Sequence, residues 1–235
     1  MRSDGGDPGS GLPDGYVPAP DDWVPFSEVP PEWSSRSRVG QPYTYISGRD
    51  RFFDDVLNVC VSLASFTVAG LTYNGNPGGF GPSSKYGLPG LAAGVDLLFD
   101  PNPLLEAVAQ DERPTALTFW AHPAGLIVEP PSREPWRILT PVVQAAFVHY
   151  YESVAGMIVE VHGDKPRAFP EPLRFGWVVR NACAHDGRVL IKDENLVATW
   201  YGLTYRRTDN GRQIIHADLT PADLIVLMEE MDDAL

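Results

Sequence analysis

Arg180 and His185 are the two residues of this sequence whose types and spacing best suit chemistry, and Asn181 directly follows the arginine. Arginine carries a permanent positive charge and a planar fork of N–H donors that matches phosphate oxygens. Histidine has an ordinary pKa of about 6.5, so it can accept or donate a proton near neutral pH. We infer that such residues could together cleave a phosphodiester bond without a metal ion.

The element that must position these residues is a helix, which the sequence predicts from about Pro172 to Ala184. Leu173 and Trp177 are spaced to face a core from one side of such a helix. Gly187 follows, and glycine is typical of the position just after a helix end. The arginine and the histidine are therefore expected at the end of a buried helix.

Three further helices are predicted from hydrophobic spacing and from residues that favour helix starts. Apolar residues recur at helical spacing from about Gly48 to Thr72. A threonine followed by proline at 140–141 is a strong helix start, and helical spacing continues from Val142 to Val161. The same start at 220–221 precedes an amphipathic C-terminal helix.

Strand signals are concentrated between the last two predicted helices. From Val189 to Tyr205 the apolar residues shift to a period of two, and Asn210 with Gly211 is a strong hairpin signal before the run from Gln213 to His216. A further strand is expected at Ala116 to Trp120. The predicted fold is mainly α, with a small antiparallel β-ribbon inserted before the C-terminal helix.

The segment from Leu173 to Gly187 resembles the signature helix of the HEPN superfamily, helical-bundle proteins found in bacterial toxins, phage-defence systems and RNA-degrading enzymes. The family motif is an arginine, a polar residue that is often asparagine, three or more residues, and a histidine. Arg180, Asn181 and His185 match it one for one. The turn, short strands and final helix that follow also resemble bacterial members, so the resemblance covers about residues 140–235.

The resemblance implies a metal-independent endoribonuclease that works as a homodimer without a cofactor, as in toxin or antiphage effectors. His185 of one subunit would take the proton from the ribose 2′-hydroxyl, and His185 of the partner subunit would protonate the departing 5′-oxygen. Arg180 would stabilise charge in the transition state, and Asn181 would orient the imidazole or bind the phosphate. RNA is the implied substrate, and an antitoxin or other regulatory protein is a further expected partner.

The charge of the chain is unevenly distributed. The net charge is -13, which argues against a general nucleic-acid binder, because such binding depends on clustered lysine and arginine. Nine of the 18 basic residues nevertheless lie between Lys165 and Arg212, where only five acidic residues occur. We expect Arg174, Arg188 and Lys192 from this basic stretch to contact the substrate.

The acidic remainder of the chain favours an alternative function, a non-catalytic HEPN-like module that binds RNA, a nucleotide or a protein. Residues 1–47 are rich in proline, glycine and acidic residues, and we expect them to form an irregular arm before a helical domain over residues 48–235. The sequence shows no signal-peptide pattern and no long uncharged apolar run, so we expect a cytoplasmic protein that does not enter a membrane.

Other candidate residues give weaker signals. No histidine or cysteine pattern has metal-ligand spacing, so no metal site is expected. Cys60 and Cys183 lie in apolar surroundings and are interpreted as buried thiols. His149 and Tyr151, on the preceding predicted helix, are interpreted as mainly structural, with the alternative that one of them lines the cleft.

Overall fold

The structure is a computed structural model that describes residues 44–73, 86–124 and 133–235. The predicted N-terminal arm, residues 1–47, lies outside these residues except for its last four, which form a strand. The α-helices are α1 (Phe53–Tyr73), α2 (Pro101–Ala109), α3 (Arg133–His162), α4 (Glu171–Cys183) and α5 (Pro221–Asp233), with short 3-10 helices at Pro166–Ala168 and Arg207–Asp209. The strands are β1 (Thr44–Ser47), β2 (Tyr86–Leu88), β3 (Val95–Phe99), β4 (Ala116–Pro123), β5 (Val197–Trp200) and β6 (Leu203–Arg206).

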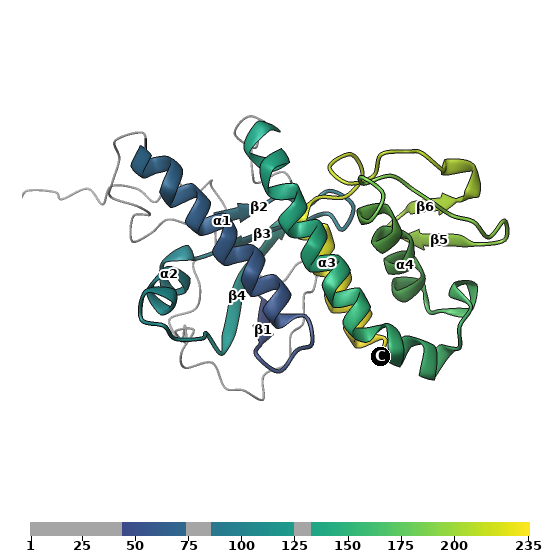
Figure 1. Ribbon diagram of the computed structural model, residues 1–235, viewed down its shortest axis with the longest axis horizontal. Coiled ribbons are helices and arrows are strands. Elements are labelled where there is room, and N and C mark those ends of the chain that lie inside the picture. Colours follow the sequence, from purple (N-terminus) through teal and green to yellow (C-terminus); the bar gives the residue numbers. More distant parts are fainter. Residues whose placement is uncertain (1–43, 74–85, 125–132) are drawn as a thin grey trace, which may run out of the picture.

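A four-stranded antiparallel sheet makes the fold mixed α/β, so the prediction of a mainly α, HEPN-like helical bundle is wrong. The strand order is β1-β4-β3-β2, and α1 lies across one face of the sheet (Figure 1). All five residues of β3 are buried. A strand buried on both faces has no alternation of apolar and polar residues, so its sequence does not differ from that of a short buried helix. Of the four strands in this sheet, the sequence predicted only the one at Ala116 to Trp120, which lies within β4.

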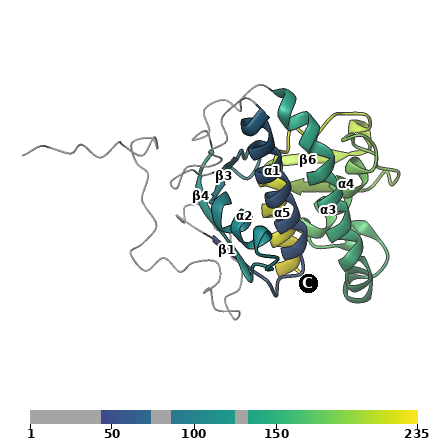
Figure 2. The same ribbon diagram turned by 60° about the vertical axis from the view of Figure 1, so that its left-hand side comes forward.

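The helices connect this sheet to the C-terminal part of the chain. α3 packs against α1, α4 and α5, and α5 also contacts β3 (Figure 2). Residues 221–229 of α5 are buried without exception. The C-terminal helix is therefore a central core helix rather than the amphipathic helix predicted, because it has neighbours on all sides.

The predicted helices α1, α4 and α5 are confirmed close to their expected bounds, whereas α3 begins earlier than expected. It starts at Arg133 and continues through Pro141, so the predicted start at 140–141 is wrong. A proline inside a helix lacks one backbone N–H donor, but the remaining turns retain their bonds. Among the described residues, one stretch, Pro141–His162, is long and apolar enough to cross a membrane. Length and composition alone are weak evidence for a membrane span, because core helices of soluble proteins share both.

The predicted ribbon is present as β5 and β6, but a different turn closes it. Tyr201 and Gly202 join the strands with φ angles of 42° and 81°, the left-handed conformation that tight hairpins need. The Asn210 side chain instead bonds both backbone groups of Ile191, at 2.7 Å from the N–H and 2.9 Å to the carbonyl. The asparagine side chain therefore holds the backbone at Ile191, and Asn210 is not part of the turn that joins β5 and β6.

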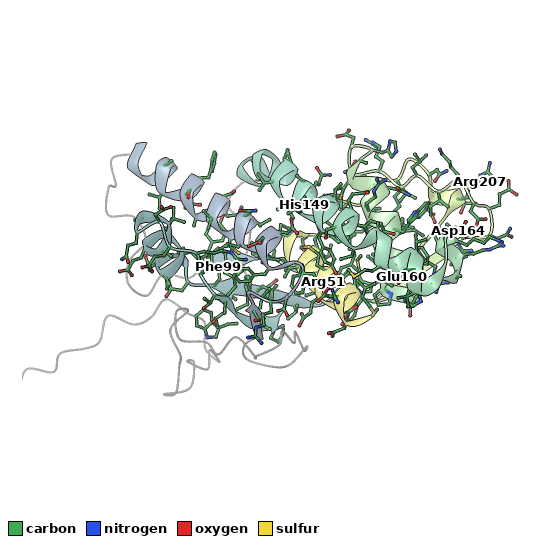
Figure 3. The ribbon with its side chains drawn as sticks, turned by 60° about the horizontal axis from the view of Figure 1, so that its bottom comes forward. Arg51, Phe99, His149, Glu160, Asp164 and Arg207 are labelled. Carbon is green, nitrogen blue, oxygen red and sulfur yellow. The ribbon has the colours of Figure 1, made fainter. Side chains whose placement is uncertain are left out.

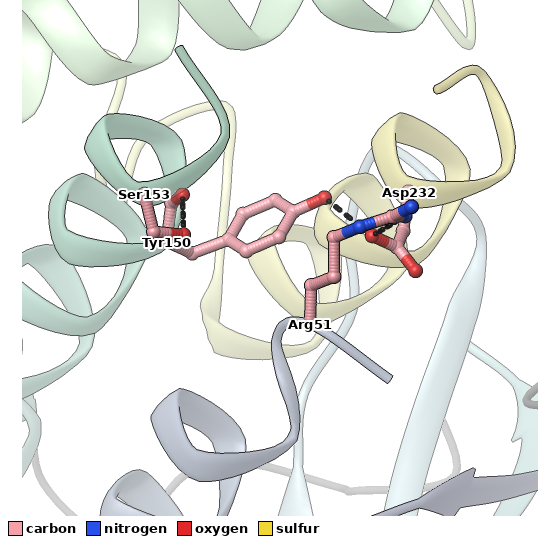
Figure 4. A network of polar contacts seen from close by, with 4 residues as sticks. All are labelled: Arg51, Tyr150, Ser153 and Asp232. Atoms are coloured by element: carbon pink, nitrogen blue, oxygen red, sulfur yellow. Dashed lines mark hydrogen bonds and ion pairs between the residues drawn. The ribbon is translucent and has the colours of Figure 1, made fainter. Parts of the chain in front are cut away.

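One polar network connects three helices (Figure 4). Arg51, just before α1, donates to Asp232 at the end of α5 over 2.8 Å, and the Tyr150 hydroxyl of α3 donates to the same carboxylate oxygen over 3.4 Å. Burial raises the pKa of Tyr150, so the hydroxyl stays a donor. The network fixes α1, α3 and α5 relative to one another.

Candidate functional site

The motif lies in the last turn of α4 and the turn that follows it, as the sequence predicted. Six residues of α4 face the core: Leu173, Phe175, Gly176, Val178, Val179 and Ala182. Phe175 stacks on Tyr205 with ring centroids 5.4 Å apart, so the helix is held against the ribbon. Burial of this face leaves Arg180 and Asn181 half exposed at the edge of the helix.

Arg180 is held in place by two neighbours. Its Nε donates to Oε1 of Glu152 on α3 over 2.5 Å, and its Nη2 contacts the same oxygen. Its Nη1 donates to Oδ1 of Asn181 over 3.0 Å. A guanidinium has five N–H donors, so two remain without a partner among the residues that the structure describes. Asn181 therefore helps to position the arginine, and the expectation that it orients the imidazole or binds the phosphate stays a prediction.

His185 lies in a tight turn beyond the helix, with its side chain exposed. The N–H groups of His185 and Gly187 both donate to the Ala182 carbonyl, over 2.9 and 2.8 Å. Gly187 has a φ of 74°, and a Cβ there would lie 2.5 Å from Nε2 of Gln213. Gly187 thus ends the turn as predicted, and this turn presents His185 to solvent.

The structure places the three residues expected to bind substrate on different segments, with Arg174 on α4 and both Arg188 and Lys192 beyond it. Arg174 precedes Arg180 by six residues, about 240° around the helix, so it faces elsewhere. The Nε of Arg174 is buried without a hydrogen-bond partner within the described part of the chain. Arg188 donates from Nη1 to the carbonyl of Gly211 over 2.9 Å, and Lys192 is exposed.

The basic stretch identified in the sequence is partly neutralised by acidic residues. Besides the Arg180 pair, Arg207 pairs with Glu194, and Arg212 pairs with Asp218 over 2.8 Å. Glu152 and Asp218 come from outside the stretch, so the sequence count of charges overestimated its local positive potential. Ion pairs of this kind weaken attraction for phosphate.

A second polar pair, which the sequence did not reveal, lies one helix turn from Glu152 on α3. His149 contacts Asp55 of α1 through Nδ1 and Oδ1, 2.7 Å apart. Both residues line a pocket of about 500 Å³ between α1 and the N-terminal half of α3, with Asn58, Val142 and Ala145 also in its wall. The two residues of the pair are 94 positions apart, so no local pattern could have linked them.

Cys60, Cys183 and Tyr151, which the sequence analysis also considered, do not supply an ionised nucleophile near neutral pH. Burial raises the pKa of Cys183 to about 12, and it also raises the pKa of Cys60, so both thiols stay protonated near neutral pH. Tyr151 is buried, and burial raises the pKa of its hydroxyl. Within residues 44–73, 86–124 and 133–235, no group of three or more His, Cys, Asp or Glu side chains could hold a metal ion.

The fold and the site define a mixed α/β protein with an arginine and a histidine exposed at the end of a core helix. Comparison with known protein families, with characterised proteins and with solved structures found no match. The chemistry of the site must therefore be argued from its own residues.

Proposed function

We propose that this protein is a metal-independent endoribonuclease, with Arg180 and His185 as its catalytic residues and the HEPN motif as its chemical basis. The observation that carries the proposal is the setting of Arg180. Its guanidinium is fixed by Glu152 and Asn181, and two N–H donors remain for a phosphate. The His185 imidazole follows in an exposed turn, where RNA has access to it.

In this proposal one imidazole removes the proton from a ribose 2′-hydroxyl, and the 2′-oxygen attacks the adjacent phosphorus. The bond from phosphorus to the 5′-oxygen breaks, and a second, protonated imidazole supplies the proton to the leaving oxygen. Arg180 donates to the phosphoryl oxygens as their charge increases. Each chain contributes one such motif, so the second imidazole is His185 of the partner subunit in a homodimer. The products are a 2′,3′-cyclic phosphate and a 5′-hydroxyl.

The proposed setting is the cytoplasm, where the RNA substrate would be found, with a role as a toxin or antiphage effector. A regulatory protein such as an antitoxin would then restrain the activity. The chain outside the basic stretch is acidic. Its negative charge opposes nonspecific RNA binding, so that part of the chain is suited to contact with a protein.

A second candidate function is a non-catalytic module that binds RNA, a nucleotide or a protein. The Glu152 carboxylate favours it, because it neutralises the Arg180 charge in each motif. A phosphate that approaches Arg180 also meets this carboxylate, which opposes binding.

Cleavage of RNA in the presence of a chelator tests the proposal and separates the two candidates. Wild-type protein should release cyclic phosphate ends, and His185→Ala should reduce the rate by at least about 100-fold, the range expected for loss of a general acid or base. His162→Ala is the matched control, because it makes the same change ten residues beyond Glu152 on α3, about 15 Å along the helix. Equal cleavage by wild type and His185→Ala would overturn the assignment.

The homodimer is tested by molar mass in solution and by combining wild-type and variant subunits. If the catalytic imidazoles come from two subunits, the molar mass should correspond to two chains. Co-expressed wild type and His185→Ala should yield heterodimers that retain one imidazole and lack the acid-base pair. Heterodimers as active as the wild-type homodimer would exclude a shared site.

A further inference from the structure

The pocket between α1 and α3 has an apolar wall and one polar end. Val142 and Ala145 of α3 contribute to the wall, and Asp55, Asn58 and His149 supply the polar groups. A pocket of about 500 Å³ is within the range of small-molecule sites, and such sites typically combine an apolar surface with few polar groups. The composition of this pocket therefore suits a flat ligand with a polar edge.

Asp55 is the most unusual residue of this pocket. Its side chain is only 8% exposed, although it lines an open pocket. Oδ1 contacts the His149 ring, and Oδ2 has no hydrogen-bond partner in the described part of the chain. Oδ2 is not sealed off in the protein interior, so it remains an acceptor that a ligand in the pocket with an N–H group can reach.

His149 has the opposite exposure. Its side chain is 76% exposed, and its Nδ1 faces Asp55. With Nδ1 occupied, Nε2 is the ring nitrogen that remains for a ligand or solvent. Asp55 thus orients an imidazole at the mouth of the pocket, where Asn58 adds an exposed amide with both donors and an acceptor.

The pocket ends at His149 on α3, one helix turn before Glu152, the partner of Arg180. His149 and Glu152 are three residues apart on α3, so they share a face and lie about 4.5 Å apart along the axis. Glu152 in turn holds Arg180. A ligand in the pocket can therefore extend past His149 toward the two remaining donors of Arg180.

We propose that this pocket binds a nucleobase, preferably guanine, of the nucleotide whose phosphate contacts Arg180. The inference rests on the proposed function for its choice of RNA as ligand. Guanine offers two adjacent N–H groups and a carbonyl on one edge, which match the acceptor Oδ2 of Asp55 and the amide donors of Asn58. Val142 and Ala145 contact the flat face of the base, and His149 lies between base and phosphate.

Binding of guanosine monophosphate tests the pocket without any requirement for catalysis. We expect wild-type protein to bind guanosine monophosphate at least about tenfold more tightly than ribose 5-phosphate or uridine monophosphate, as titration calorimetry measures. Ala145→Trp should remove this preference by filling the pocket. Asp55→Asn should also remove it, because the variant loses the negative charge and replaces one acceptor oxygen by an NH2 group, which cannot accept an N–H group.

Glu160→Trp is the matched control, because it adds the same side chain to an exposed position of the same helix, 15 residues away from Ala145. Figure 3 shows Glu160 well separated along α3 from His149. This control should bind guanosine monophosphate as wild type does. Circular dichroism and thermal unfolding show whether each variant is folded. If Ala145→Trp or Asp55→Asn is not folded, Asn58→Ala is measured in its place.

The possible outcomes separate this inference from the proposed function. Base-selective binding that the pocket variants abolish supports the pocket, even if wild type cuts no RNA and the proposed function fails. Equal binding of guanosine monophosphate and ribose 5-phosphate overturns the pocket. Guanosine monophosphate binding that Ala145→Trp and Asp55→Asn leave unchanged also overturns it, even if His185-dependent cleavage shows that the proposed function is correct.

Discussion

Asp223 in the first turn of α5 accepts a hydrogen bond of 2.9 Å from the backbone N–H of Ala93, which lies 130 residues earlier. The same carboxylate accepts from the N–H of Leu91 and from the N–H and hydroxyl of Thr220. The Thr220 hydroxyl also contacts the carbonyl of Pro89 at 2.6 Å. The predicted helix start at 220–221 thus serves a second purpose, because it attaches the loop before β3 to the core helix.

Replacement of this carboxylate should destabilise the whole domain. Asp223→Ala removes the helix cap and leaves buried N–H groups without acceptors, which should lower the free energy of unfolding by about 2–4 kcal/mol. Urea denaturation followed by circular dichroism measures the change. Asp233→Ala, exposed on the same helix, is the control and should change stability by less than about 0.5 kcal/mol. Equal effects of the two substitutions would show that the attachment contributes little.

The contribution of Asp223 to stability should also depend on pH. Burial raises the pKa of this carboxyl in the folded protein, although the hydrogen bonds from Thr220, Ala93 and Leu91 lower it. The folded state therefore binds this proton more tightly than the unfolded state does. The resulting stabilisation is fully present below the ordinary pKa of 3.8 and is lost as pH rises through the folded value.

Comparison with Asp223→Asn isolates this effect, because the variant has no carboxyl at this position to titrate. The difference in unfolding free energy, wild type minus variant, should increase as pH falls from about 7 toward 4. A difference that decreases over this range would mean that hydrogen bonds to the ionised form dominate instead. Urea denaturation at each pH provides the measurement.

Glu152→Gln should increase affinity for RNA, because it removes the negative charge that pairs with Arg180. We expect a gain of about three- to tenfold at low salt, which should shrink as salt rises. Fluorescence anisotropy with a labelled single-stranded RNA and the His185→Ala background, which prevents cleavage, provides the measurement. Glu160→Gln makes the same change of charge on α3 away from Arg180, and an equal gain there would contradict a specific role for Glu152.

Gly187→Ala should destabilise the turn that carries His185. A side chain at a φ of 74° is strained, and the new Cβ would lie 2.5 Å from Nε2 of Gln213. We expect a loss of about 1–3 kcal/mol in thermal or urea unfolding. Gly202→Ala separates the two causes, since Gly202 has a φ of 81° but a Cβ there would meet no described atom within 4 Å. If both variants lose the same stability, the contact with Gln213 is unimportant.

The two thiols should be unreactive in the folded protein. Burial raises the pKa of Cys183 to about 12, and the thiolate is the reactive form. A thiol reagent at about pH 8 should therefore label neither Cys183 nor Cys60 quickly, and both should react at once after denaturation. Fast labelling of Cys183 in the native state would show that the end of α4 opens readily.

Local patterns predicted the helices well and the sheet poorly. Periodic apolar residues and start signals located α1, α4 and α5, because the residues that define a helix are neighbours in the sequence. The four-stranded sheet depends on β1 pairing with β4 and on β2 pairing with β3. Short strands buried among helices carry no distinctive period, so the fold class was predicted wrongly.

The sequence by itself determined that Arg180, Asn181 and His185 lie at the end of a buried helix, because helical spacing and Gly187 fix that end locally. Only the tertiary structure decided their surroundings. Glu152 reaches Arg180 because α3 packs against α4, and Asp55 reaches His149 because α1 packs against α3. The first contact joins residues that are 28 positions apart in the sequence, and the second joins residues that are 94 positions apart. Both depend on how the helices pack, which local sequence patterns do not predict.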